Sequence, residues 1–265
     1  MRLAARHPRA NNLFPVKDQK YLASHCEVFL YYNRPVFPPT VMTTPSTIAL
    51  NTYIDHTLLS PTANETAVRK LCEEAWIHQF KAVCVAPTYV AYTKDMLEFC
   101  PIRIEIATVI GFPLGYSTLS TKLHEAAAAL RDGATELDVV MNISQFKSMA
   151  YLSIREELTQ LASLAHQQDA LLKVIIETAY LDSFELHTAC EICAESQVDF
   201  VKTSTGFAPK GAEVETVRLM RSLLPDSIQI KASGGIRTKE QALAFIEAGA
   251  SRLGTSAGVA IVGEA

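Results

Sequence analysis

The sequence predicts an α/β protein whose main part folds as a single (β/α)8 (TIM) barrel. Short apolar runs alternate with amphipathic segments eight times between Tyr53 and Gly254, as the strands and helices of this fold do. The structural rival is a doubly wound sheet, which would be expected to carry a Gly-rich turn after its first strand. No Gly-x-Gly-x-x-Gly occurs anywhere in the chain, so the barrel is the better prediction.

The eight expected strands are bounded by polar or turn residues and separated by helical patterns. They are Tyr53–Leu58, Lys81–Ala86, Arg103–Ile110, Glu136–Asn142, Leu171–Glu177, Asp199–Thr203, Ile228–Ser233 and Arg252–Gly254. Thr62 with Glu65 predicts a capping box on the first helix, and Thr238 with Gln241 predicts one on a later helix. Gly133 fits the C-terminal stop of the helix before the fourth strand.

Residues 1–45 differ in composition from the rest and are expected to form an extension outside the barrel domain, residues 46–265. They hold six Lys or Arg residues against two Asp or Glu, and prolines interrupt any long element. They lack the apolar core and the cleavage site of a secretory signal. An organelle transit peptide would also be basic, but the prolines weaken that interpretation. The favoured hypothesis is a non-essential extension, with Met42 beginning the working domain.

Composition and charge argue against several classes of protein. The chain has 265 residues and is 49% hydrophobic, yet no apolar run approaches the roughly 20 residues of a membrane helix. A net charge of -4 without a basic stripe argues against a general nucleic-acid binder. The six cysteines are scattered and do not resemble a disulfide framework, which predicts a reduced, cytoplasmic protein.

No metal site is expected from the sequence. Cys190 and Cys193 form one Cys-x-x-Cys, but a zinc site would need a second ligand pair and none follows. The segment Phe184–Ala194 has a helical pattern, so two buried small side chains are the favoured account of this pair. No His-Glu-x-x-His motif or clustered set of His and carboxylate residues occurs elsewhere.

Alternation within the strands places charge inside the barrel, because successive side chains of a barrel strand face the interior and the helices in turn. In the fourth and fifth strands the apolar side chains share the helix side, so Asp138, Lys173 and Glu177 point inward. The same parity turns Lys202 and Lys231 inward. Isolated charges there would be costly, so these residues form either a structural ion-pair network or a site in which they compensate one another.

Lys202 and Lys231 lie at the carboxyl ends of neighbouring strands, where the active sites of this fold are found. Two adjacent ammonium groups disfavour each other's charge, so one can be neutral near pH 7 and attack a carbonyl. Asp138 and Asp55 supply carboxylates for proton transfer or for holding the second lysine charged. For Lys202 considered alone, the rival account is a lysine that snorkels at a sheet edge.

Turns that contain glycine follow the last three expected strands. Barrels often bind phosphate with the last two of these loops, because glycines let backbone N–H groups approach an anion and hydroxyls add donors. Ordinary left-handed turns are the alternative for any single glycine. The expected substrate- and phosphate-binding residues are Thr205, Gly206, Gly234, Gly235, Gly254 and Ser256.

Between Tyr53 and Gly258 the chain resembles the deoxyribose-phosphate aldolases, a family of class I, Schiff-base aldolases. The segments that carry the resemblance are together very specific. They are Ile54–Leu59, Val83–Val85, Glu136–Asn142, Val201–Phe207, Ile230–Ile236 and Gly254–Ser256. The chain departs from the family in its N-terminal extension and in ending soon after the eighth strand.

The resemblance implies reversible cleavage of 2-deoxy-D-ribose 5-phosphate to D-glyceraldehyde 3-phosphate and acetaldehyde, without a metal or an organic cofactor. It implies that Lys202 forms the Schiff base, that Asp138 and Lys231 form a proton relay, and that Asp55 supports it. The expected partners are small phosphorylated sugars and aldehydes. A homodimer or a homotetramer would be compatible with the resemblance.

Two other functions stay open at this point. Another lysine aldolase or a transaldolase-like barrel would share the imine but act on a different sugar phosphate. A non-catalytic barrel that binds a phosphorylated ligand would share the fold and the anion site alone. The second alternative is disfavoured because anion binding does not need an inward Asp138 beside two lysines.

Overall fold

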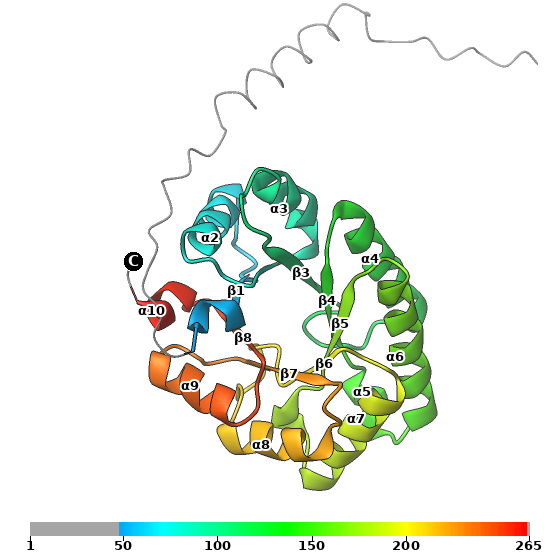
Figure 1. The fold of residues 1–265 in the computed structure, drawn as a ribbon. Coiled ribbons are helices and arrows are strands. Elements are labelled where there is room, and N and C mark those ends of the chain that lie inside the picture. The colour runs from blue at the N-terminus through cyan, green and yellow to red at the C-terminus, as the bar shows by residue number, and fades with distance from the viewer. Residues whose placement is uncertain (1–47, 264–265) are drawn as a thin grey trace, which may run out of the picture. The chain divides into compact units, whose positions relative to one another are not determined.

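The computed structural model describes residues 48–263 and shows eight parallel strands in a closed barrel (Figure 1). The strands are β1 (Ile54–Leu58), β2 (Ala82–Val85), β3 (Glu105–Ile110), β4 (Glu136–Val140), β5 (Leu171–Ile175), β6 (Phe200–Lys202), β7 (Gln229–Ser233) and β8 (Arg252–Thr255). Each strand pairs with the next along the chain, and β8 pairs with β1. The predicted barrel is confirmed, and all eight strands lie where they were expected, with ends shifted by at most two residues.

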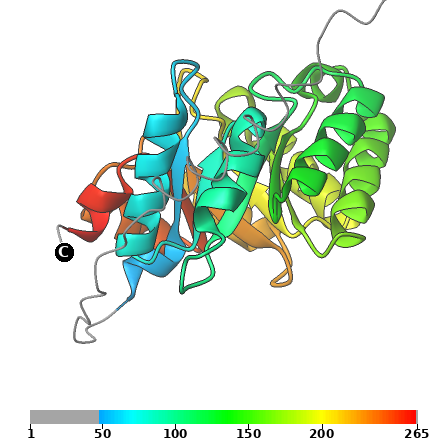
Figure 2. The ribbon, with the colours of Figure 1, turned by 90° about the horizontal axis from the view of Figure 1, so that it is seen from above.

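Helices surround the strands, as the two views show (Figures 1 and 2). They are α2 (Glu65–Ile77), α3 (Val90–Leu97), α4 (Leu119–Asp132), α5 (Ile143–Lys147), α6 (Tyr151–His166), α7 (Ser183–Glu195), α8 (Val214–Leu223), α9 (Lys239–Glu247) and α10 (Gly258–Val262). Three short 3-10 helices are η1 (Leu50–Tyr53), η2 (Pro87–Tyr89) and η3 (Thr178–Tyr180). Within residues 48–263 none of the helices has the length and apolar character needed to cross a bilayer.

The ends of three helices test the predicted caps. Thr238 caps α9 in a reciprocal capping box with Gln241, and Gly133 ends α4 in the left-handed conformation, so both predictions are confirmed. The capping box predicted at Thr62 is wrong, because α2 starts two residues later. Asn64 is its N-cap, and its side chain accepts a hydrogen bond from the Ala67 backbone N–H.

The strand register confirms the parity argument for the barrel interior. Leu137 and Val139 of β4 are fully buried on the helix side, and Asp138 between them faces the interior. There Asp138 is the register partner of Lys173 on β5. The strands are buried on both faces because helices cover the outside and side chains fill the inside.

Two other expectations concern segments away from the interior. Cys190 and Cys193 are buried on α7, as predicted for two small side chains on a helix. The extension predicted for residues 1–45, and Met42 as its boundary, lie outside the described residues.

Candidate active site

Two lysines and one aspartate meet inside the barrel near the carboxyl ends of the strands. Lys202 on β6 and Lys231 on β7 are register partners, and both donate to Oδ2 of Asp138 on β4, at 2.7 and 2.6 Å. Oδ1 of Asp138 accepts a hydrogen bond from Lys173 at 2.8 Å. All four side chains are buried, but Lys202 keeps 3% exposure and lines a cavity, so a ligand can reach it.

Asp55 on β1 and Arg252 on β8 extend this cluster across the barrel. Lys231 Nζ lies 2.5 Å from Asp55 Oδ2, and Arg252 Nε donates to Asp55 Oδ1 at 2.6 Å. The guanidinium also donates two parallel hydrogen bonds to Glu136, at 3.0 and 2.8 Å. The structure thus joins the predicted residues Lys202, Lys231, Asp138 and Asp55 in one cluster with Glu136, Lys173 and Arg252.

The two lysines at Asp138 differ in their affinity for a proton. Burial lowers the pKa of Lys202; attraction from Asp138 opposes this effect, and repulsion from Lys231 adds to it. Burial also acts to lower the pKa of Lys231, but attraction from Asp138 and Asp55 outweighs it and raises that pKa above its usual range. Lys202 is therefore the amine that loses its proton more easily, while Lys231 stays charged.

The two aspartates of the cluster stay ionised. Burial acts to raise the pKa of Asp138, but Lys173, Lys202 and Lys231 hold it well below its usual range. Burial likewise acts to raise the pKa of Asp55, and Arg252 together with Lys231 lowers it. Both carboxylates can therefore accept protons or hydrogen bonds at neutral pH.

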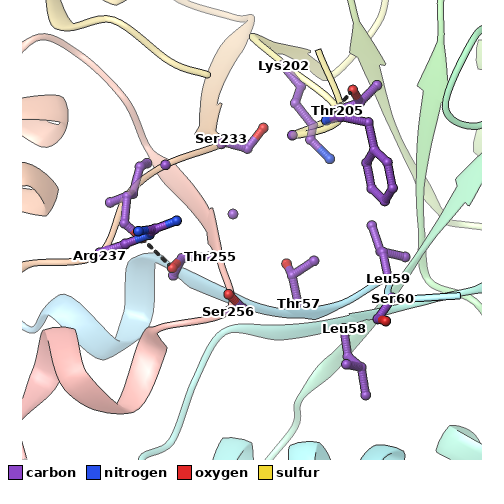
Figure 3. Close-up of a pocket in the computed structure, with 16 residues that line it drawn as sticks. Thr57, Leu58, Leu59, Ser60, Lys202, Thr205, Ser233, Arg237, Thr255 and Ser256 are labelled. Carbon is purple, nitrogen blue, oxygen red and sulfur yellow. Dashed lines mark hydrogen bonds between the residues drawn. The ribbon is translucent and has the colours of Figure 1, made fainter. Parts of the chain in front are cut away.

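A cavity of about 330 Å³ lies at the carboxyl ends of β1, β6, β7 and β8, with Lys202 in its wall (Figure 3). The loops that follow β6, β7 and β8 form much of the remaining lining, and the end of β1 contributes Thr57 and Leu58. All six residues expected to bind substrate or phosphate line this one cavity: Thr205, Gly206, Gly234, Gly235, Gly254 and Ser256.

Two of these glycines are needed for different reasons. Gly235 has φ +83°, and a Cβ there would meet nothing within 4 Å, so its backbone is open to a ligand. A Cβ at Gly254 would lie 3.1 Å from Cε of Lys231 and 2.9 Å from Cβ of Ser233. Gly254 therefore leaves room for the stem of the buried lysine as well as lining the cavity.

The profile of one protein family, described as DeoC/LacD family aldolase, matches residues 50–263. The chain belongs to this family. As a member of an aldolase family, it is a lyase.

Relatives and solved structures agree with this family assignment. Deoxyribose-phosphate aldolase of Thermococcus gammatolerans is 50% identical over 210 residues, which are 79% of this chain and 93% of the relative. The crystal structure of a putative deoxyribose-phosphate aldolase from Coccidioides immitis is 36% identical, with a TM-score of 0.78, over 94% of this chain and 97% of the other. A tetrameric deoxyribose phosphate aldolase from Aeropyrum pernix is 37% identical, with a TM-score of 0.75, over 80% and 89% of the two chains.

The cavity at the carboxyl ends of the strands also contains Arg237, to which the sequence analysis gave no role. Arg237 lines it and brings a positive charge to it (Figure 3). Arg237 follows Gly234 and Gly235 in the same turn, and this position in the sequence could have identified it as a residue of the cavity. Within residues 48–263 there is no group of three or more His, Cys, Asp or Glu side chains placed to hold a metal ion.

Glu177 takes a different place from the one that parity predicted. β5 ends at Ile175, and Glu177 has a left-handed backbone, φ 50°, so its side chain contacts the loop after β6. Its Oε2 accepts hydrogen bonds from the Thr205 N–H at 3.1 Å and from the Thr205 hydroxyl at 2.5 Å. The Thr205 hydroxyl oxygen in turn accepts from the Phe207 N–H at 3.1 Å. Buried Glu177 thus fixes the loop that carries Thr205 and Gly206 to the cavity.

Proposed function

We propose that this chain reversibly cleaves 2-deoxy-D-ribose 5-phosphate to D-glyceraldehyde 3-phosphate and acetaldehyde through a Schiff base at Lys202. The observation that carries the proposal is a buried amine of lowered pKa in the wall of a cavity whose loops suit a phosphate. The substrate is supported by relatives at about 50% identity that bear the name deoxyribose-phosphate aldolase.

The chemistry follows from the state of Lys202. Its neutral amine attacks the aldehyde carbon of the open-chain sugar, one proton is taken up, water leaves, and the product is an iminium cation. A base takes the proton of the C3 hydroxyl, the C2–C3 bond breaks, and its electron pair moves toward the positive nitrogen, which leaves an enamine and releases D-glyceraldehyde 3-phosphate. A proton added to the enamine carbon, followed by hydrolysis, releases acetaldehyde and restores the amine.

Asp138 and Lys231 are the proposed proton relay. Both lysines donate to the same Asp138 oxygen, so a proton can pass between them through one carboxylate. Asp55 contacts Lys231 from the other side and, in this role, holds it charged and oriented. The relay serves the two proton transfers that bond cleavage and enamine protonation require.

The phosphate is assigned to the opposite part of the same cavity. Ser256 and the backbone N–H groups of the glycine loops supply donors, and Arg237 supplies charge. Thr205 lines the same part of the cavity, and its own two donors go to Glu177, which holds the loop in place. This placement leaves Lys202 at the aldehyde end of the sugar.

Borohydride reduction in the presence of acetaldehyde tests the Schiff base. Reduction should add one ethyl group at Lys202, located by peptide mass spectrometry, and Lys202→Ala should lose the adduct. Lys147→Ala is the matched control, because Lys147 is surface-exposed and pairs with Glu185. Absence of the adduct from the unmodified protein would favour the non-catalytic barrel. An adduct without cleavage of 2-deoxy-D-ribose 5-phosphate would favour a lysine aldolase of another sugar phosphate.

We also propose that residues 1–45 are not needed for folding or activity. The family match begins at residue 50, which supports this division. The Coccidioides immitis structure aligns over 94% of this chain, so the truncation has to be measured. Expression of residues 42–265 should give a folded aldolase of unchanged kcat, and loss of either property contradicts the proposal.

A homodimer or homotetramer in the cytoplasm is proposed as the working state. The Aeropyrum pernix relative is described as a tetramer, and the free cysteines among the described residues suit a reducing compartment. Light scattering of the purified protein at several concentrations tests the assembly, and a monomer at all of them contradicts it. Fractionation of the source cells tests the compartment.

A further inference from the structure

The buried charges beside Lys202 form a closed ring in which three carboxylates alternate with three cations. In order around the ring the members are Arg252, Glu136, Lys173, Asp138, Lys231 and Asp55. Each neighbouring pair has charged atoms 2.5–2.8 Å apart, and Asp55 meets Arg252 to close the ring. Every member is at least 95% buried.

Charge balance in this ring singles out Lys202. The six ring charges sum to zero, and Lys202 is a seventh group, attached to the ring at Asp138. A proton on Lys202 gives the buried cluster one uncompensated positive charge, which is costly away from water. The cluster therefore favours the neutral amine, which is the form that attacks a carbonyl.

The same balance acts on the reaction itself. The iminium restores the uncompensated positive charge, and formation of the neutral enamine removes it. A neutral ring thus favours bond cleavage as well as amine attack. An additional carboxylate in the ring would stabilise the iminium and the protonated amine together.

We propose that Glu136 and Arg252 are positioning residues that set the proton occupancy of Lys202 through the charge balance of the ring. The inference rests on the proposed Schiff base and adds two residues to it. Arg252 lies opposite Asp138 in the ring order, and neither Glu136 nor Arg252 lines the cavity. Their influence is electrostatic and reaches Lys202 through Asp138 and Lys231.

The other groups in contact with Lys202 do not alter this balance, and Arg237, which lines the same cavity, carries its charge in every variant compared below. Asp138 from β4 and Lys231 from β7 belong to the ring, and Cys84 from β2 is a buried thiol whose pKa is raised by burial, so it is neutral. Phe200 precedes Lys202 on the same face of β6 and carries no charge. Lys173 Nζ and Arg252 Cζ lie 5.9 and 5.8 Å from the centre of its ring, so the phenyl group helps to hold both cations in place.

Three variants test charge balance against a merely structural role: Arg252→Gln, Glu136→Gln and the double variant. The readout is the pH midpoint of borohydride trapping by acetaldehyde. Arg252→Gln removes a cation, which favours the protonated form of Lys202 and should raise the midpoint by on the order of 1 pH unit. Glu136→Gln removes a carboxylate and should lower the midpoint by a similar amount. The double variant restores neutrality, so its midpoint should return to within a few tenths of a unit of the starting value.

A structural role predicts a different pattern. Each single variant would then trap less acetaldehyde at every pH, with no opposite shifts of the two midpoints, and the double variant would trap least. That result overturns the inference. Arg252→Lys keeps the charge but loses the bidentate geometry, so its midpoint should match the unmodified protein. A midpoint for Arg252→Lys that follows Arg252→Gln would also overturn it.

A measurement on the unmodified protein covers variants that fail to fold. A neutral amine, an aldehyde and one proton give the iminium and water, so imine formation near pH 7 should take up one proton per adduct. Calorimetry in buffers of different ionisation enthalpy counts that proton, and no uptake overturns the inference. Absence of any adduct at Lys202 would instead refute the proposed function, so the two failures are distinguishable.

Discussion

Glu177→Gln should weaken binding of the phosphorylated sugar while sparing the chemistry at Lys202. The buried carboxylate accepts two hydrogen bonds from Thr205, and Gln keeps the shape of the side chain but removes its charge. Hydrogen bonds to charged groups contribute about 1.5–3 kcal/mol and neutral ones about 0.5–1.5, so the two bonds together lose about 2 kcal/mol. That energy corresponds to about 30-fold in the population of the ordered loop.

The rise in KM follows from the fraction of molecules that keep the loop ordered. Apparent affinity falls in proportion to the binding-competent fraction, so KM for 2-deoxy-D-ribose 5-phosphate should rise by up to about 30-fold. Exchange of the acetaldehyde methyl protons with solvent needs Lys202 but no phosphate, and it should stay within about twofold.

A surface glutamate gives the matched control for this variant. Glu215 pairs with Arg218 on α8 and its side chain is 82% exposed, so Glu215→Gln should leave KM unchanged. An unchanged KM in Glu177→Gln, or equal losses of sugar cleavage and acetaldehyde exchange, would refute the role assigned to Glu177.

The other predictions address the cavity and the cluster. Gly235→Val should raise KM for the phosphorylated sugar about tenfold or more, because a valine strains the backbone at φ +83°, and it should spare acetaldehyde exchange. Equal losses of sugar cleavage and of acetaldehyde exchange would mean that the loop has a structural role and does not bind the phosphate. Lys202→Ala should abolish trapping, whereas Lys231→Leu should keep a trappable amine with its pH profile moved upward; the reverse pattern would mean that the roles are swapped. The pKa of Asp138 is lower in the folded state, so its contribution to stability is present above about pH 4 and lost as the pH falls through that pKa. The Tm of Asp138→Asn should therefore fall less than that of the unmodified protein between pH 6 and 3, and parallel losses would contradict this.

The fold was predictable because a barrel repeats one local pattern eight times. Each apolar run had to be a strand buried on both faces, and each amphipathic segment had to cover one side of the sheet. The helix start at Asn64 was missed because Thr62 and Asn64 both suit an N-cap, and only backbone conformation decides between them. Strand ends were uncertain for a similar reason, since pairing stops where the neighbouring strand does.

The site was predictable where parity within one strand was enough. Asp138, Lys173, Lys202 and Lys231 were all found by their inward position, and the structure brings them into contact. Glu136 lies two residues before Asp138 and shares its face, so the same rule could have found it.

The positions of two residues could not be predicted from parity within one strand. Arg252 needed the register between strands, which makes it the partner of Lys231. The position of the Glu177 side chain could not be predicted, because Glu177 has a left-handed backbone, which is uncommon in a residue other than glycine and ends the alternation of side chains after β5.

The interior of this barrel explains why so many of these residues depend on one another. Barrel interiors are ordinarily filled by branched apolar side chains, yet here six of the eight strands place charged groups inside. Removing one partner of such a set leaves another buried charge unpaired, which costs about 3–5 kcal/mol. Gly254 shows a similar dependence in volume, since a Cβ there would lie 2.9 Å from Cβ of Ser233 and 3.1 Å from Cε of Lys231, so the stem of Lys231 would have to shift. The arrangement that lowers the pKa of Lys202 is therefore also the arrangement that lets the barrel interior hold its charges.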